Sequence, residues 1–279
     1  MHNLPALRRN HSKIVNSLYK TNGLKVYFAS DFHLGVEGNL PAIQRERIIV
    51  EWLQMAGQDA DTIYLVGDLF DFWFEYAKAV PRGHIRFLGT LAQLRDAGVH
   101  LEIFTGNHDM WMFDYLENEL NLRIHRAPIR KKLGDFEFFI GHGDGLGPGD
   151  LGYKRLKRVF AHPFAQWLFA RIHPNLGVRI AEYWSGTSRA KNQGAEQYLG
   201  PESEWLIQYC ENQIKNGDTA DFFIFCHRHL TIDFTLSNGS RYINLGEWMH
   251  ARSYAVFDGR KLSIKFYKNK EGHIITDAP

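Results

Sequence analysis

Five short groups of acidic, histidine and asparagine residues occur along this chain, and each comes directly after a run of apolar residues. The groups are Ser30-Asp31-Phe32-His33, Gly67-Asp68-Leu69-Phe70-Asp71, Gly106-Asn107-His108-Asp109, Gly141-His142-Gly143-Asp144 and Cys226-His227-Arg228-His229. Carboxylates, imidazoles and an amide oxygen together suit divalent ions such as Mn²⁺, Fe²⁺ or Zn²⁺, and they disfavour Ca²⁺ and iron–sulfur clusters. The candidate ligands are Asp31, His33, Asp68, Asn107, His142, His227 and His229. Because these are too many for one ion, the pattern predicts two ions, bridged by Asp68, that hold the attacking and leaving oxygens of a phosphoryl displacement.

Each group has a simpler explanation when it is taken alone. Asp31 and His33 are compatible with a capped turn, and an isolated pair such as Gly67-Asp68 is usually a turn. The five groups together are harder to explain this way, because turn chemistry calls neither for histidine nor for this order. In open α/β sheets, ligands bind in the crevice beyond the carboxyl ends of the strands. We therefore expect the five groups to build one site.

The apolar runs before these groups predict the strands that position them. Each run is short and rich in β-branched and aromatic residues. The predicted strands span residues 25–29, 62–66, 100–104, 136–140 and 222–225. The gaps at 41–57 and 83–98 have the apolar period of amphipathic helices. Near the end of the chain, residues 241–245, 253–258 and 262–267 predict antiparallel strands, the last two joined by a turn at Asp258-Gly259. This alternation predicts an α/β fold in one large domain.

The last of the five groups follows the strand predicted at 222–225. If that strand continues, its period of two points His227 and His229 to one face and Arg228 to the other. Cys226 has two interpretations, a soft metal ligand or a buried, inert thiol at the end of a strand. We favour the buried thiol, because free cysteine behaves as a small apolar side chain.

Composition restricts the class of protein further. The formal net charge of the 279-residue chain is +2, which favours neither nucleic-acid binding nor an acidic tail. Cys210 and Cys226 have no zinc-type spacing, and we expect both to be reduced, in a cytoplasmic protein. No apolar run approaches the roughly 20 residues that span a bilayer, so any membrane contact is expected to be peripheral. Residues 1–23 predict a basic N-terminal extension, with Arg8, Arg9, Lys13 and Lys20.

In this order, the motifs D-x-H, G-D, G-N-H-D, H-G-D and H-x-H closely resemble those of the calcineurin-like metallophosphoesterases, over about residues 24 to 250. The resemblance implies a four-layer αββα sandwich, within a domain at 24–279, that holds two divalent ions, with Mn²⁺ favoured and Fe²⁺ or Zn²⁺ as alternatives. One ion would be held by Asp31, His33, Asp68 and His229, and the other by Asp68, Asn107, His142 and His227.

The same resemblance implies a reaction. A metal-bound hydroxide would attack phosphorus, because the ions acidify water. His108 resembles a general acid for the leaving oxygen. Asp71 resembles the carboxylate that orients the His108 imidazole, since a carboxylate on one ring nitrogen fixes the tautomer and raises the basicity of the other.

The segment after the fourth group differs in composition from the rest of the chain. Residues 151–181 contain no acidic side chain and combine basic with large apolar residues. His162-Pro163 and His173-Pro174 predict helix breaks, because proline suits the first turn of the next helix. The aromatic residues could pack on the sandwich, or they could, with the basic residues, meet an anionic membrane surface or a phosphate-bearing lipid. We expect a helical cap insertion at about 151–210.

Further motifs look like those of one group in the family, the UDP-2,3-diacylglucosamine pyrophosphatases of lipid A synthesis. These motifs are Gly67-Asp68-Leu69-Phe70-Asp71-Phe72-Trp73, His142-Gly143-Asp144 followed by Asp150-Leu151-Gly152-Tyr153, and Leu245-Gly246-Glu247-Trp248. Those enzymes release UMP and 2,3-diacylglucosamine 1-phosphate, and a helical insertion holds the acyl chains. The likeness implies peripheral contact with the cytoplasmic face of the inner membrane. It implies substrate contacts at Asn107, His108, Asp150, Ser188, Asn192 and His227.

Two other functions stay open. Those pyrophosphatases commonly have G-N-R-D where this chain has His108, so the chain could be a soluble phosphodiesterase or phosphatase that acts on nucleotides or phosphoproteins. It could also be a non-catalytic scaffold that binds proteins. The scaffold is disfavoured because such relatives usually lose metal ligands, and none of the expected ligands is missing from this sequence.

Overall fold

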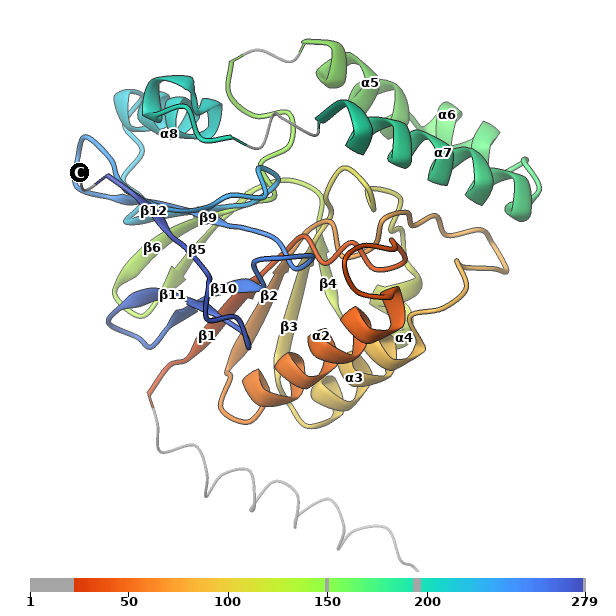
Figure 1. Cartoon of the computed structure of the whole chain (residues 1–279), viewed down its shortest axis with the longest axis horizontal. Coiled ribbons are helices and arrows are strands. Elements are labelled where there is room, and N and C mark those ends of the chain that lie inside the picture. Colours follow the sequence, from red (N-terminus) through yellow and green to blue (C-terminus); the bar gives the residue numbers. More distant parts are fainter. Residues whose placement is uncertain (1–22, 149–150, 193–196, 278–279) are drawn as a thin grey trace, which may run out of the picture.

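A computed structural model describes residues 23–148, 151–192 and 197–277 of the chain (Figure 1). The predicted N-terminal extension, apart from residue 23, and the candidate residue Asp150 lie outside these ranges. The described chain is an α/β fold with two mixed six-stranded sheets. This architecture confirms the fold class that the sequence predicts.

The first sheet has the strand order β11-β10-β1-β2-β3-β4. Its strands are β1 (Val26–Ala29), β2 (Thr62–Val66), β3 (His100–Phe104), β4 (Arg123–His125), β10 (Ser253–Phe257) and β11 (Leu262–Phe266). Strands β1 to β4 are parallel neighbours, while β10 pairs antiparallel with β1 and β11. The carboxyl ends of β1, β2 and β3 therefore lie at the same edge.

The second sheet has the order β12-β8-β9-β7-β6-β5. Its strands are β5 (Ile129–Leu133), β6 (Phe136–Ile140), β7 (Phe222–Phe225), β8 (Thr231–Thr235), β9 (Arg241–Leu245) and β12 (Ile275–Thr276). Strands β6, β7 and β9 are parallel. Each predicted strand is present, with bounds that differ by at most one residue at either end.

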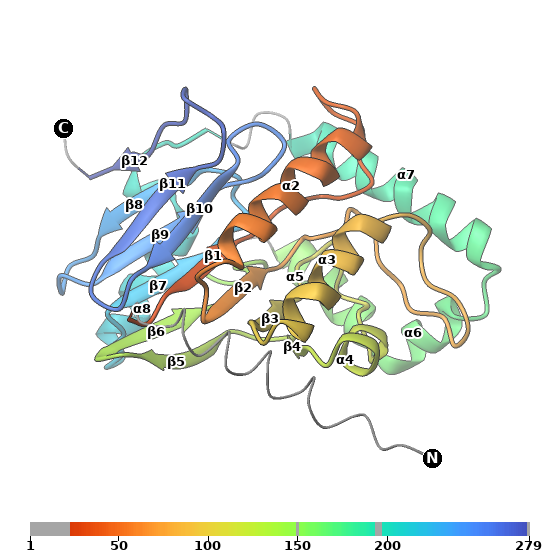
Figure 2. The ribbon, with the colours of Figure 1, turned by 90° about the horizontal axis from the view of Figure 1, so that it is seen from below.

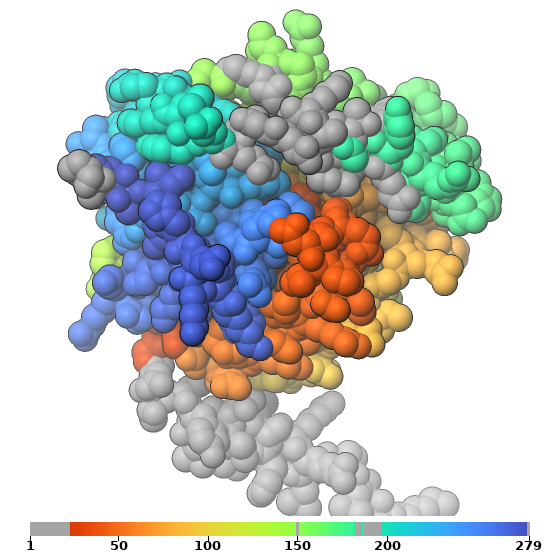
Figure 3. Space-filling model, viewed as in Figure 1, coloured from red at the N-terminus to blue at the C-terminus, as the bar shows by residue number. Residues whose placement is uncertain are grey.

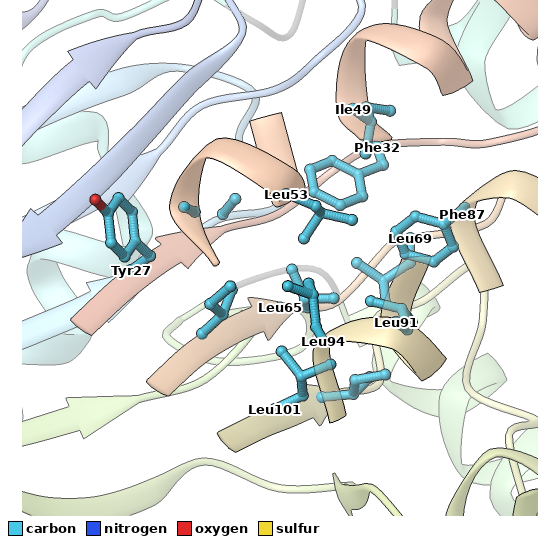
Figure 4. Close-up of a cluster of buried hydrophobic side chains, with 14 of the residues drawn as sticks. Tyr27, Phe32, Ile49, Leu53, Leu65, Leu69, Phe87, Leu91, Leu94 and Leu101 are labelled. Carbon is cyan, nitrogen blue, oxygen red and sulfur yellow. The ribbon is translucent and has the colours of Figure 1, made fainter. Parts of the chain in front are cut away.

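Helices α2 (Ala42–Ala56) and α3 (Ile85–Asp96) cover the outer face of the first sheet, and α8 (Trp205–Lys215) covers that of the second. The other helices are α4 (Tyr115–Leu120), α5 (Leu151–Ala161), α6 (Pro163–Phe169), α7 (Pro174–Asn192) and the 3₁₀ turn η1 (Pro201–Ser203). In α2 the buried side chains Ile49, Trp52, Leu53 and Ala56 recur at helical spacing, so one face of the helix turns to the sheet. Figure 4 shows this layer, with Ile49 and Leu53 of α2 and Phe87, Leu91 and Leu94 of α3 above the first sheet.

Side chains that alternate along the central strands build the remaining layers. Phe28 of β1 and Tyr64 of β2 face Phe138 of β6 in a cluster between the two sheets. Phe223 and Phe225 of β7 point the other way and pack against α8. The order of layers is therefore helices, sheet, sheet, helix, which is the four-layer αββα sandwich. Figure 2 shows α2 and α3 on one side of the first sheet, with the second sheet on its other side.

Helices α5, α6 and α7 lie together outside the sandwich, along one edge of the molecule (Figures 1 and 3). The predicted breaks are present, since α6 begins at Pro163 and α7 at Pro174. Several large apolar side chains on these helices are exposed, including Phe164, Trp167 and Leu168. Among the described helices, none combines the length and the apolar character that a bilayer span requires. We refer to α5–α7 as the cap and propose that it is the predicted helical insertion.

Candidate metal centre

The five sequence groups come together beyond the carboxyl ends of β1, β2, β3, β6 and β7. The first three strands belong to one sheet and the last two to the other. A first cluster combines Asp31, His33 and His229, whose ligand atoms all lie within 4.8 Å of one another. The Nε2 atoms of His33 and His229 are 3.1 Å apart, and Asp31 Oδ1 lies 3.3 Å from His229 Nε2. Three potential ligands thus meet around one point.

A second cluster lies beside the first. The ligand atoms of Asp68, His142 and His227 also lie within 4.8 Å of one another. His142 Nε2 is 3.3 Å from Asp68 Oδ2 and 3.3 Å from the side-chain oxygen of Asn107. Asp68 forms a further group with His33, which belongs to the first cluster. Asp68 is therefore within reach of both clusters, as its predicted bridging position requires.

The donor set fits two divalent transition ions. It consists of buried or half-buried imidazoles, carboxylates and one amide oxygen, which bind ions such as Mn²⁺, Fe²⁺ and Zn²⁺. Asp31 Oδ1 is fully buried and makes no hydrogen bond within the described residues, as expected of an oxygen whose bonding a cation completes. Burial raises the pKa of Asp68, but His142, His108 and His33 outweigh burial and hold this pKa well below its usual value. The Asp68 side chain is therefore deprotonated and negatively charged at neutral pH.

Most of the candidate ligands have an unusual backbone conformation. Asp31, His33, Asp68, His227 and His229 all have positive φ angles, between 43° and 71°. Non-glycine residues rarely adopt this left-handed region. Main-chain hydrogen bonds hold it here, since the amide of Asp31 donates to the carbonyl of Gly67 at 3.0 Å and that of His33 to the carbonyl of Asp68 at 3.0 Å. The loops after β1 and β2 thereby fix each other.

Two glycines of the motifs are required by close packing at the site. A Cβ atom on Gly67 would lie 2.5 Å from His142 Nδ1, and Gly67 also has a φ of +88°. A Cβ atom on Gly106 would lie 2.2 Å from Asp68 Oδ1. The glycines that precede Asp68 and Asn107 therefore leave room for candidate ligands.

The carbonyl of Val66, at the end of β2, sets the orientation of His142. His142 Nδ1 lies 2.9 Å from this oxygen and 3.1 Å from Cys226 Sγ. Burial raises the pKa of Cys226 to about 12, so Cys226 is a neutral thiol that donates to the same carbonyl at 2.8 Å. A proton on Nδ1 leaves Nε2 free as a ligand. The sequence identified Cys226 as a buried thiol but did not predict this contact.

The structure corrects the predicted reason for the geometry of the last motif. Strand β7 ends at Phe225, and His227 and His229 have left-handed backbones, so strand alternation does not orient them. Arg228 does point away from the candidate ligands, because its guanidinium donates to both carboxylate oxygens of Glu204, at 3.1 and 3.0 Å. Arg228 also lies 4.3 Å from the centre of the Trp205 ring. A buried ion pair therefore anchors the loop that carries both histidines.

His108 and Asp71 are neighbours at the rim of the site. His108 Nδ1 lies 3.0 Å from the main-chain oxygen of Asp71 and 3.5 Å from its carboxylate. The amide of His108 donates to Asp68 Oδ1 at 2.8 Å. This contact ties the candidate acid to the candidate bridging carboxylate.

Asp109 has a supporting role that sequence reasoning did not assign. Its fully buried carboxylate accepts from the amides of Leu69 and Gly106, both at 2.7 Å. Burial and the charge of Asp68 raise the pKa of Asp109 to about 7. Asp109 therefore joins the loops that carry Asp68 and Asn107, and its position in the G-N-H-D motif was the available signal.

An apolar cavity opens beside these residues. Its volume is about 170 Å³, and it runs from Asn107 and His108 to the cap. The walls include Trp111, Phe160 and Phe169. Trp111 connects the body with the cap, since its indole nitrogen donates to the carbonyl of Phe160 at 2.9 Å. The cap thus forms an apolar wall next to the candidate metal centre.

The remaining predicted substrate contacts stay predictions. Asp150 lies outside the described residues. Ser188 and Asn192 belong to α7, but their side chains lie outside the described part of the structure. His227 has its ligand atom in the second cluster, together with Asp68 and His142.

No family model matches the chain. Among curated proteins, the chain is 37% identical over 259 residues to the UDP-2,3-diacylglucosamine hydrolase of Porphyromonas gingivalis, with 88% of this chain and 99% of the relative covered. It is 27% identical over 234 residues to the UDP-2,3-diacylglucosamine hydrolase of Aeromonas salmonicida, with 84% and 89% covered.

Solved structures with low similarity include Vps29 from Chaetomium thermophilum, at a TM-score of 0.43 and 10% identity, with 90% of this chain and 92% of that chain covered. A hypothetical protein from Pyrococcus horikoshii has a TM-score of 0.44 and 13% identity, with 89% of each chain covered.

The similarity to the Porphyromonas protein extends over nearly the whole of that relative, and a sequence identity of 37% over this length shows membership of the same family. The chain therefore belongs to the UDP-2,3-diacylglucosamine hydrolase family.

Proposed function

We propose that the chain hydrolyses the pyrophosphate bond of UDP-2,3-diacylglucosamine and releases UMP and 2,3-diacylglucosamine 1-phosphate. The observation that carries this proposal is the position of the two candidate ligand clusters directly beside an apolar cavity. A substrate with a pyrophosphate next to acyl chains requires metal ligands for the pyrophosphate and an apolar wall for the acyl chains. Family membership supports the same substrate, since the relatives bear its name.

In this proposal, Asp31, His33, Asp68 and His229 would hold one ion. Asp68, Asn107, His142 and His227 would hold the other. We favour Mn²⁺, with Fe²⁺ and Zn²⁺ as alternatives that the same ligands accept. When bound, such ions acidify water and stabilise negative charge on phosphoryl oxygens.

The side chains of the protein supply the remaining functions. His108 donates a proton to the leaving oxygen, and Asp71 orients its ring through its main-chain oxygen, 3.0 Å from Nδ1, and its carboxylate, 3.5 Å from the same atom. Asn107 and His227 contact the cleaved phosphate. Trp111, Phe160 and Phe169 pack against acyl carbons in the apolar cavity and exclude water from that end of the site.

The cap also suits a substrate that resides in a membrane. Phe164, Trp167 and Leu168 are all more than half exposed. Exposed aromatic and aliphatic side chains beside basic ones favour binding at an anionic membrane surface. We propose that the cap contacts the cytoplasmic leaflet of the inner membrane, from which it takes the substrate.

The direct test is a turnover assay with Mn²⁺ and detergent-dispersed UDP-2,3-diacylglucosamine that follows UMP release. We expect release by the wild-type protein and a loss of about 100-fold or more in His142→Ala, because the second ion would lose a ligand. His100→Ala is the matched control, since His100 is exposed at the start of β3. Equal turnover of a cyclic nucleotide or a soluble phosphomonoester would contradict the proposed substrate, and unchanged activity in His142→Ala would contradict a metal-dependent enzyme.

A further inference from the structure

A second cavity, of about 490 Å³, adjoins the candidate metal centre. It shares Asp71 and Phe72 with the apolar cavity, so these two residues stand between the two spaces. Leu34 and Gly35, which directly follow the candidate ligand His33, form part of its wall. The two cavities therefore meet at Asp71 and Phe72, next to the candidate centre, and they extend from there along different walls.

The walls of the two cavities differ in charge. Arg82 and Arg179 line the second cavity, and both are exposed. Among the described residues that line the apolar cavity, none is an arginine or a lysine. The second cavity also lies at the start of α7, with Pro174 and Asn175 in its wall, where the helix dipole adds positive potential. The second cavity is thus suited to an anionic ligand.

The second cavity also has flat, rigid walls. Phe72, Tyr76 and His84 supply aromatic rings, and Pro81 and Pro174 supply proline rings. The His84 ring is held in place by Phe70, at 5.0 Å between ring centres. Aromatic side chains stack on nucleobases whatever the base, because every base has a π face. A planar, anionic ligand fits these walls better than an acyl chain does.

We propose that this second cavity binds the UMP half of the substrate, with Arg82 and Arg179 holding its negative charge and the ring-bearing walls packing against uracil. This inference rests on the proposed function, in which the apolar cavity takes the acyl half. The volume of the second cavity, about 490 Å³, leaves room for a nucleotide. A smaller cavity beside His142 and Asp144, at about 40 Å³, is too small for a nucleotide.

The test compares the two products as ligands of the Mn²⁺-loaded protein. The double variant Arg82→Ala/Arg179→Ala removes the cationic wall, and Arg158→Ala/Arg171→Ala removes the same charge from exposed cap positions outside both cavities. Dissociation constants for UMP and for 2,3-diacylglucosamine 1-phosphate are measured by calorimetry and as product inhibition. We expect the first variant to weaken UMP about tenfold or more, because charge-assisted hydrogen bonds are lost. Binding of the lipid product should change less than twofold.

Each outcome separates the cavity assignment from the proposed function. If both double variants bind UMP like the wild type, or if UMP does not bind the wild type, the assignment is wrong. It is also wrong if Arg82→Ala/Arg179→Ala weakens both products equally, since the arginines would then serve the whole substrate. If the wild type fails to release UMP from the lipid substrate, the proposed function is wrong, and a selective loss of UMP binding in the variant would still support a nucleotide site.

Discussion

At the scale of single residues, His142 shows how neighbouring groups prepare a side chain for metal binding. The Val66 carbonyl and the Cys226 thiol both contact Nδ1, while Nε2 faces Asp68 and Asn107. Partners on the far side of a ligating imidazole fix its tautomer and its orientation. His142 itself could be predicted from its motif, whereas its partners come from β2 and from the end of β7, so their contacts depend on the tertiary fold.

The chain has two buried cysteines, which provide a controlled test of this arrangement. Cys226→Val keeps an apolar side chain but removes the contact with His142, and we expect metal affinity to fall about tenfold, as is usual when such a partner is lost. Cys210→Val is the control, because Cys210 lies on α8 in the outer core. Bound metal is measured after competition with a chelator. Equal metal retention by the two variants would show that Cys226 only fills space.

At the scale of elements, the strands and the motifs after them could be predicted, because both signals are local in sequence. The breaks at Pro163 and Pro174 could be predicted for the same reason. The prediction missed four strands, β4, β5, β8 and β12. Of these, β4 and β5 are edge strands with a weak signal, since β4 has only three residues and β5 carries Arg130, Lys131 and Lys132 among five residues. Edge strands of this kind lack the apolar run that identifies a buried strand.

Contacts between the cap and the metal centre were not predictable, because they join distant elements. Asp144 is the last residue of the fourth motif, and its carboxylate accepts from Tyr153 at 2.6 Å and from Lys157 at 2.5 Å. Burial raises the pKa of Asp144, but His142 and Lys157 outweigh burial and lower this pKa. Helix α5 is therefore fixed to the loop of a candidate ligand by a charged contact.

Loss of this contact should affect the cap more than the fold. Lys157→Met keeps most of the side chain but removes the charge next to Asp144, and we expect KM for the lipid substrate to rise about tenfold. Arg158→Met is the matched control, because Arg158 is exposed on the same helix. The measurement is kcat and KM for the lipid substrate in the two variants, by steady-state kinetics. A fall in kcat alone, with KM unchanged, would contradict a role in positioning the cap.

At the scale of the whole molecule, the candidate centre joins the two sheets. Asp31, His33, Asp68 and Asn107 follow strands of the first sheet, while His142, His227 and His229 follow strands of the second. Ions held between them would add a link between the layers that the apolar cluster already joins. Metal binding should therefore contribute to the stability of the entire sandwich.

Removal of metal should lower the melting temperature. A ligand present at 100 times its dissociation constant stabilises a protein by about 2.7 kcal/mol, which for a chain of this size corresponds to about 5 to 10 °C. We expect chelation to cause such a decrease and added Mn²⁺ to reverse it, as followed by scanning calorimetry. In His142→Ala the response to Mn²⁺ should be much smaller. A wild-type melting temperature that is insensitive to chelation would contradict metal binding between the sheets.

The left-handed backbones of Asp31, His33, Asp68, His227 and His229 have a consequence for evolution and for protein engineering. Each non-glycine residue in this region costs on the order of 1 kcal/mol relative to glycine, which adopts it freely. Selection for thermal robustness alone would replace these residues and would thereby erase the site. In a library screened only for folding, we expect other residues, glycine above all, to replace the native ones at these positions and to abolish activity. The native side chains there thus reflect selection for activity at the expense of stability.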